Sequence, residues 1–239
     1  KLAKQEGKEM ELEKNLDQVW QTIHNSLAKA GRSRDELHLI AVSKTRSAEE
    51  VRQLYTLGQL DFGENKPQEI RDKLPLLPPE VRWHMIGHLQ ANKLKYVAGK
   101  CVLIHSVDSL KLAQEIEDYA GKHGLTVDVL LQLDIARDGQ KQGFLETEIH
   151  EAVKRITEYR HLSVKGLMTV APYVSAAENN RSIFQRIRQI SVDIQAKNYD
   201  NVSMNVLSMG MSNDYPIAIE EGATHVRVGT AIFGERNYK

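Results

Sequence analysis

Lys44 ends a run of β-forming residues, "LHLIAVSKT" from Leu37, and is the first candidate for chemistry in this chain. A lysine amine that is desolvated near another cation has a lowered pKa and can attack a carbonyl carbon. A solvated lysine at the rim of the protein is the more common fate of a single lysine. Lys44 alone leaves both interpretations open, so its neighbours must decide between them.

Arg227 is the second candidate, because it lies inside a strand-like run, "THVRVG" from Thr224. Side chains alternate between the two faces of a strand, which puts His225, Arg227 and Gly229 on one side. A guanidinium stays charged and is costly to bury without a partner. Arg227 therefore needs a fixed acceptor, which is either an internal salt bridge or an atom of a ligand.

Two loops near the end of the chain, "SMGMSND" and "VGTAIFGER", have the composition of phosphate-binding loops. Ser208 and Ser212 offer hydroxyls around Gly210. Gly229 and Thr230 offer accessible backbone amides and a hydroxyl where a helix should begin. Small residues of this kind also form ordinary turns, so each loop alone is weak evidence.

The elements that must position these residues are short apolar β-rich runs that alternate with helical segments. Eight such runs begin at Leu37, Asp61, Trp83, Cys101, Thr126, Leu162, Met204 and Thr224. Eight βα units in 239 residues predict a single (β/α)8 TIM barrel, which is the α/β fold of about this size. A doubly wound open sheet is the alternative, and the lack of a glycine-rich dinucleotide fingerprint after the first run argues against it.

We expect residues 1–36 to form an N-terminal helical extension, with a charged amphipathic helix from about Met10 to Ala30, and residues 37–239 to form the barrel. In a closed barrel the first and last strands are neighbours, and reactive groups lie at the carboxyl ends of the strands. Lys44, Arg227 and both loops then share one mouth. A lysine, phosphate loops and an arginine facing a pyridine together specify pyridoxal 5'-phosphate (PLP) held as a Schiff base.

Composition excludes several other classes of protein. Lysine plus arginine equal aspartate plus glutamate at 32 each, and the one short basic segment, "KLKYVAGK", fits a solvated helix face, so we expect no nucleic-acid partner. No apolar stretch is long enough to span a membrane, and the N-terminus is too polar for a secretory signal, so we expect a cytoplasmic protein. The single cysteine, Cys101, allows no disulfide within the chain and is expected to be buried and inert.

A metal hydrolase barrel would need clustered histidine and aspartate ligands at the strand ends. His84 and His88 are four residues apart, but Gly87 and the strand character of this segment deny them a shared helical face. We therefore expect no metal site, and expect both histidines at the rim.

The ordered motifs of the chain resemble the pyridoxal phosphate homeostasis proteins, also called the YggS or PROSC family. The motifs are "AVSKT" at 41–45, "FGEN" at 62–65, "WHMIGHLQANK" at 83–93, "GLMT" at 166–169, "LSMGMSND" at 207–214 and "VRVGTAIFGER" at 226–236. The resemblance implies a barrel like the N-terminal domain of alanine racemase that binds PLP without an established turnover reaction.

The resemblance also implies roles for individual residues. Lys44 would form the internal aldimine, Ser208, Gly229 and Thr230 would hold the phosphate, Arg227 would face the pyridine nitrogen and Asn65 would lie near the ring. Lys141, in "DGQKQG", matches a lysine of the family that would handle cofactor entry or release. Many relatives have an aromatic residue where this chain has Lys66, so we expect no aromatic stacking contact at that position.

A carrier and an enzyme remain to be distinguished. Racemisation needs two bases on opposite faces of the substrate carbon, and Lys44 can serve one face. In alanine racemases a tyrosine from an additional β domain serves the other face, and here the barrel uses the whole chain. We expect a protein that stores and delivers PLP in vitamin B6 and amino-acid homeostasis, a monomer whose further partners are PLP-dependent apoenzymes. A PLP-dependent racemase or lyase is the alternative, and racemases of this fold share the arginine.

Overall fold

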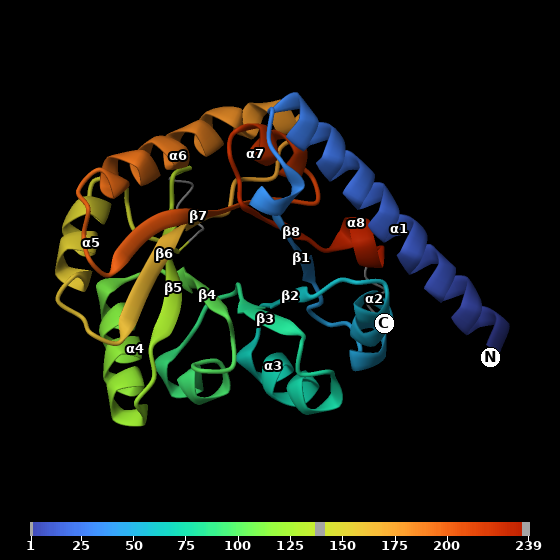
Figure 1. Cartoon of the computed structure of the whole chain (residues 1–239), viewed down its shortest axis with the longest axis horizontal. Helices are drawn as coiled ribbons and strands as arrows, with labels where there is room; N and C mark the ends of the chain where they lie inside the picture. The colour runs from blue at the N-terminus through green and yellow to red at the C-terminus, as the bar shows by residue number, and fades with distance from the viewer. Residues whose placement is uncertain (1, 137–141, 236–239) are drawn as a thin grey trace.

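Eight parallel strands close into a barrel in the computed structural model, which describes residues 2–136 and 142–235 (Figure 1). The strands are β1 His38–Val42, β2 Asp61–Glu64, β3 Arg82–Met85, β4 Leu103–Val107, β5 Val127–Leu133, β6 Leu162–Thr169, β7 Val202–Met211 and β8 His225–Val228. Each strand pairs with the next, and β8 pairs with β1 in register from His38 opposite His225 to Ala41 opposite Val228. The predicted (β/α)8 barrel is confirmed.

Helices surround the strands as an outer ring (Figure 1). They are α2 Ala48–Thr56, α3 Pro67–Lys73, α4 Leu110–His123, α5 Ile149–Ile156, α6 Arg181–Gln195, α7 Tyr215–Glu220 and α8 Thr230–Phe233, with short 3-10 helices η1 Arg34–Glu36, η2 Leu74–Leu76, η3 Ala91–Tyr96 and η4 Ala177–Asn180. Local sequence sets several of the ends. Ser47 and Glu50 form a capping box at the start of α2, and Gly124 ends α4 in a left-handed conformation with φ of 61°.

Two elements differ from the sequence prediction. The basic segment "KLKYVAGK", expected to lie on a solvated helix face, begins inside the 3-10 helix η3, which ends at Tyr96. The N-terminal helix α1 spans Leu2–Lys29 and begins eight residues before Met10, because residues 2–9 are mostly strong helix formers. Helical periodicity locates the apolar face of a helix better than it locates its ends.

Helix α1 runs along the outside of the barrel past α7 and α8 (Figure 1). It buries one apolar stripe at helical spacing: Leu12, Leu16, Val19, Ile23 and Leu27. The side-chain amide of Asn15 donates to the carbonyl of Ile232 in α8 at 3.0 Å. The stripe belongs to the same hydrophobic core as the barrel, while the boundary at residues 36 and 37 stays a prediction.

The interior of the barrel is divided into an apolar part and a polar part. Leu103, Leu130 and Met168 form a small apolar cluster inside. The buried polar side chains along the strands include Asp61, His84, His105, Ser208, His225 and Arg227. Polar groups in a closed interior need partners, and this group contains the candidate arginine.

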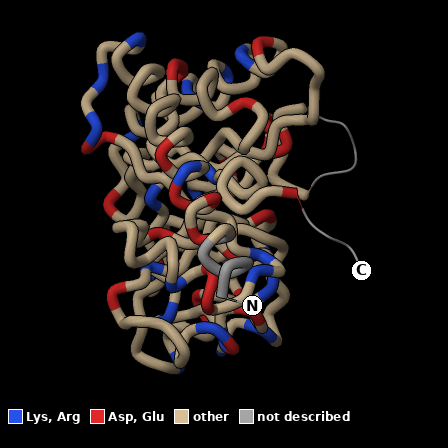
Figure 2. The backbone as a smooth tube through the Cα atoms, turned by 90° about the vertical axis from the view of Figure 1, so that its right-hand side faces the viewer, with Lys and Arg blue, Asp and Glu red and all other residues tan. Residues whose placement is uncertain are grey.

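Charges of both signs are scattered along the backbone in the side view, without a basic stripe on that side (Figure 2). This distribution agrees with the equal numbers of acidic and basic residues. Over residues 2–136 and 142–235, no helix is long and apolar enough to cross a bilayer.

Candidate functional site

The register between β1 and β8 brings the two ends of the chain together at the carboxyl end of the strands. Ala41 lies opposite Val228, so Val42 and Gly229 are neighbours, and a Cβ on Gly229 would lie 3.4 Å from Val42 Cβ. Lys44 follows two residues later and is partly buried. Lys44 and Gly229, which the sequence predicted to share a mouth, therefore lie at the same end of adjacent strands.

A buried lysine holds the turn that carries Lys44. The Nζ atom of Lys73, from α3, donates to the Ser43 carbonyl at 2.9 Å, and Glu69 accepts from the Thr45 amide at 2.8 Å. Lys73 Nζ also lies 2.8 Å from Glu69 Oε2, which links the two contacts. Thr45 has a positive φ of 65°, which is uncommon for a residue with a side chain. Contacts on both sides of Lys44 thus fix this strained turn.

Glu64 completes the network behind the turn. Its Oε1 accepts from Lys73 Nζ at 2.7 Å and from the Ser43 hydroxyl at 2.7 Å. Among the described residues, Glu64 Oε2 is buried and has no hydrogen-bond partner. Burial raises the pKa of Glu64 to about 7, although Lys73 and Ser43 both favour the charged form.

Arg46 ties the same loop to the last helix. Its Nη2 donates to the carbonyl of Gly234 at 2.6 Å, and its guanidinium lies 5.4 Å from the ring centre of Phe233. The loop after β1 and the end of α8 are thereby held as one unit.

Arg227 is buried and has two fixed acceptors, as its chemistry requires. Its Nη1 donates to Ser208 Oγ at 2.5 Å, and its Nη2 donates to the Thr169 carbonyl at 2.8 Å. Both acceptors are uncharged, so neither contact is the internal salt bridge that the sequence left open. Burial lowers the pKa of Arg227 to about 10, and the negative charge of Asp214 opposes this effect.

Ser208 and Ser212 have different surroundings. Ser208 is fully buried in β7, where its Oγ contacts Arg227 and lies 2.9 Å from His105 Nδ1. Ser212 lies in the loop after β7, and its Oγ accepts from the Gly229 amide at 3.1 Å. The structure brings Ser212 rather than Ser208 to the start of α8. Ser208 as a phosphate ligand stays a prediction, and the geometry gives it a second role beside Arg227.

Two buried side chains hold the loop that carries Ser212. Asp214 accepts from the Met211 amide at 2.7 Å and from the side-chain amide of Asn180 at 2.8 Å. Gly210 has a φ of 92°, and a Cβ there would lie 2.6 Å from Ala218 Cβ. The path of this loop therefore requires a glycine.

Asn65 and Lys66 follow β2 at the same end of the barrel. The Asn65 backbone packs so closely on Gly87 that a Cβ on Gly87 would lie 2.3 Å from the Asn65 carbonyl oxygen. Lys66 is exposed and precedes Pro67, the first residue of α3. Lys141 lies outside the described residues.

The prediction that His84 lies at the rim is wrong. His84 is 2% exposed, and its Nε2 lies 2.9 Å from Asp61 Oδ1 inside the barrel. Strand alternation turns it inward, and Asp61 compensates its burial. His88 is exposed, and its Nδ1 lies 3.2 Å from Asp108 Oδ2. Within the described ranges, no three His, Cys, Asp or Glu side chains form a group that could hold a metal ion.

Sequence reasoning missed several residues of these networks, among them Asp61, Glu64, Lys73 and His105. For the strand residues a signal was present, because each is a polar residue within a short strand covered on both faces. Lys73 gave no comparable signal, since lysines on helices are normally solvated.

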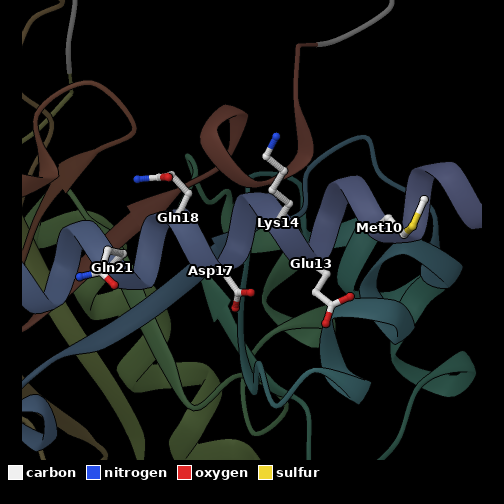
Figure 3. Close-up of a pocket in the computed structure, with 6 residues that line it drawn as sticks. All are labelled: Met10, Glu13, Lys14, Asp17, Gln18 and Gln21. Atoms are coloured by element: carbon white, nitrogen blue, oxygen red, sulfur yellow. The ribbon is translucent and has the colours of Figure 1, made fainter.

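A shallow depression elsewhere on the surface follows α1 (Figure 3). Its lining residues are Met10, Glu13, Lys14, Asp17, Gln18 and Gln21. In Figure 3, Lys14 and Gln18 point to one side of the helix, and Glu13 and Asp17 point to the other. All the lining residues come from one helix, and their side chains do not point toward a common position. The depression is therefore no candidate site.

The fold is a parallel barrel with a lysine after β1, an arginine in β8 and small residues after β7 and β8. Proteins of this class carry their binding or catalytic site at one end of the barrel, where the strands have their carboxyl ends. The chain belongs to the family described as the alanine racemase N-terminal domain, which matches residues 15–237. Within that family it belongs to the pyridoxal phosphate homeostasis proteins. The protein of that name from Aquifex aeolicus strain VF5 is 40% identical over 224 residues, which cover 93% of this chain and 97% of the relative.

Two solved structures are similar over most of the chain. A protein of unknown function from Bifidobacterium adolescentis has a TM-score of 0.90 and 31% identity, and the match covers 95% of this chain and 96% of that one. PipY from Synechococcus elongatus PCC7942, solved with PLP bound, has a TM-score of 0.78 and 34% identity, covering 89% of this chain and all of PipY. The resemblance predicted from the sequence motifs is confirmed.

Proposed function

We propose that this protein binds PLP at the carboxyl end of its barrel and serves in PLP homeostasis. The observation that carries the proposal is the pairing of β1 with β8, which joins the turn of Lys44 to Gly229 and to the strand of the buried Arg227. The names of the relatives and the PLP in the PipY structure support the same ligand.

The donor set of this structure fits the cofactor. We assign Lys44 as the amine that meets the aldehyde and Arg227 as the cation that faces the pyridine nitrogen. Gly229, Thr230 and Ser212 would hold the phosphate, because Gly229 leaves space at the start of α8 and the Ser212 and Thr230 hydroxyls can donate there. Asn65 would contact the ring from the loop after β2. Ser212 is added to this set because its hydroxyl lies next to the Gly229 amide.

When bound, PLP supplies an aldehyde carbon open to attack by an amine and a pyridine ring that can withdraw electrons. Arg227 limits the second property. A permanent cation next to the pyridine nitrogen opposes protonation of that nitrogen, which weakens the ring as an electron acceptor. A ring that is held but only weakly activated suits a protein that stores and hands on the cofactor. We therefore propose a carrier, with racemase or lyase activity as the outcome that would replace this assignment.

Absorption spectroscopy tests the proposal. We expect the purified protein, loaded with PLP, to absorb in the visible range and to retain the cofactor covalently after borohydride reduction. Lys44→Ala should abolish the covalent retention. The control is Lys66→Ala, which removes an exposed lysine after β2 and should leave it unchanged. A wild-type protein that takes up no PLP would refute the proposed function.

A second assay separates carrier from enzyme. The loaded protein is incubated with a panel of L-amino acids, and D-enantiomers and keto acids are measured over time. A carrier should give no sustained turnover, whereas turnover at enzymatic rates would favour the racemase or lyase. Delivery to PLP-dependent apoenzymes, a monomeric state, a cytoplasmic location and a role of Lys141 in cofactor transfer stay predictions.

A further inference from the structure

A continuous chain of hydrogen bonds crosses the interior of the barrel and ends at Arg227. Asp61 Oδ1 lies 2.9 Å from His84 Nε2, and His84 Nδ1 lies 2.9 Å from His105 Nε2. His105 Nδ1 lies 2.9 Å from Ser208 Oγ, which accepts from Arg227 at 2.5 Å. The five residues come from β2, β3, β4, β7 and β8. None of these side chains is more than 8% exposed.

One end of the chain opens toward solvent at the amino end of the barrel. Asp61 lines a cavity there together with His38, Arg82 and Lys165. Arg82 Nη2 lies 2.6 Å from Asp61 Oδ2, and His38 Nδ1 lies 3.5 Å from the same atom. Burial alone would raise the pKa of Asp61, but hydrogen bonds from His38 and His84 and the charge of Arg82 lower it. Asp61 is therefore a carboxylate at neutral pH.

The atoms in contact determine the direction of every bond. A carboxylate can only accept, so His84 donates from Nε2. Burial lowers the pKa of both histidines, which keeps them neutral with one bare nitrogen each. His84 Nδ1 must then accept from His105 Nε2, and His105 Nδ1 must accept from the Ser208 hydroxyl. The Ser208 oxygen then accepts from Arg227. Each hydrogen bond therefore has its donor on the Arg227 side and its acceptor on the Asp61 side.

We propose that Asp61, His84 and His105 are positioning residues that act through Ser208 to fix Arg227 where it faces the cofactor. A serine hydroxyl without a partner rotates freely, and its proton would then compete with Arg227 for the same space. Because the Ser208 proton is committed to His105, the Ser208 oxygen is a better and better-directed acceptor, since hydrogen bonds in a chain polarise one another. The Asp61 carboxylate, which can only accept, sets the direction of every hydrogen bond between itself and Arg227.

The inference rests on the proposed function, because Arg227 must face bound PLP for its position to matter. The first measurement does not depend on PLP. In the apo protein, 15N chemical shifts of the imidazoles of His84 and His105 should show neutral rings with hydrogen on Nε2 and none on Nδ1 at pH 7. A doubly protonated ring, or a hydrogen on Nδ1 of either residue, would contradict the assigned direction of the hydrogen bonds and overturn the proposal.

The second measurement tests how the hydrogen bonds from Asp61 to Arg227 affect the bound cofactor. Asp61→Asn keeps the shape of the side chain but removes the charge, and its amide can donate toward His84. We expect a shifted absorption maximum of bound PLP and a Kd for PLP about threefold to tenfold higher, the range expected for loss of one neutral hydrogen bond. The matched control is His161→Gln, which breaks a histidine–carboxylate pair with Glu117 outside the barrel and should change neither quantity.

A double-variant cycle excludes a merely structural role. Ser208→Ala removes the hydroxyl that joins His105 to Arg227, so adding Asp61→Asn to this variant should cause no further spectral shift. The proposal would be overturned by additive spectral shifts. It would also be overturned if wild type binds PLP and the Asp61→Asn spectrum is identical to that of wild type. If Asp61→Asn fails to fold, His84→Gln takes its place in the same cycle. A wild-type protein that binds no PLP would instead overturn the proposed function and this inference with it.

Discussion

Replacing Lys73 with methionine should destabilise the protein in a pH-dependent way, because it removes the cation behind the Lys44 turn. The Lys73 amine has three acceptors within 2.9 Å, namely Glu64, Glu69 and the Ser43 carbonyl, and the side chain is 9% exposed. Removing one partner of a buried ion pair costs about 3–5 kcal/mol. Glu64 can escape part of this cost by binding a proton, since its pKa is already raised to about 7. We therefore expect a loss near the lower end, about 3 kcal/mol at pH 7.

The sign of the pH effect follows from the raised pKa of Glu64. The folded state holds this proton to higher pH than the unfolded chain, in which a glutamate titrates near pH 4.3. The free energy of unfolding therefore falls as the pH rises from about 4.3 through 7. Without Lys73 the pKa of Glu64 rises further, so Lys73→Met should lose more stability at pH 8 than at pH 5.

Thermal unfolding followed by circular dichroism checks both points. In a chain of 239 residues a loss of about 3 kcal/mol lowers Tm by about 6–12 °C. Lys111→Met, on the exposed face of α4, is the matched control and should change Tm by less than about 2 °C. A Tm loss for Lys73→Met below 2 °C at pH 7, or a loss equal at pH 5 and pH 8, would refute the reasoning about the buried pair.

Three further predictions address other parts of the molecule. Gly87→Ala should press on the Asn65 backbone, lowering stability by at least about 1–3 kcal/mol and raising the Kd for PLP; an unchanged Tm in thermal melts would contradict this. Ile23→Ala, in the fully buried stripe of α1, should cost about 2–5 kcal/mol; a loss below 1 kcal/mol in urea unfolding would mean that α1 adds little to the core. Burial raises the pKa of Cys101 to about 12, so it should react with a disulfide reagent at pH 8 on the order of a thousandfold more slowly than free cysteine; rapid labelling of the native protein would show an accessible thiolate.

Strand and helix patterns were sufficient to predict the barrel, because eight alternating units have few closed arrangements. The position of Lys44 beside the carboxyl end of β8 followed from the closure, since strand one must neighbour strand eight. These predictions depend on the order of the elements along the chain. They do not require the register between strands or the path of any loop.

The networks behind the site depend on the register and on the loops, so the sequence did not reveal them. His105 meets Ser208 across the barrel only because β4 and β7 have particular registers with their neighbours. Ser212, rather than Ser208, reaches Gly229 because the loop turns sharply at Gly210. Lys73 reaches the turn of Lys44 because of the rotation of α3 on the barrel. Each of these contacts joins residues whose relative positions no local pattern encodes.

The pairing of β1 with β8 also has a consequence for the order of events during synthesis. His38 lies opposite His225, so the contact that closes the barrel waits until β8, almost 190 residues after β1, has left the ribosome. Contacts between such distant segments form late and slowly. Arg46 then adds its bond to Gly234, which follows α8. A growing chain therefore has no complete cofactor site, and cannot capture PLP there, until β8 has been synthesised and has paired with β1.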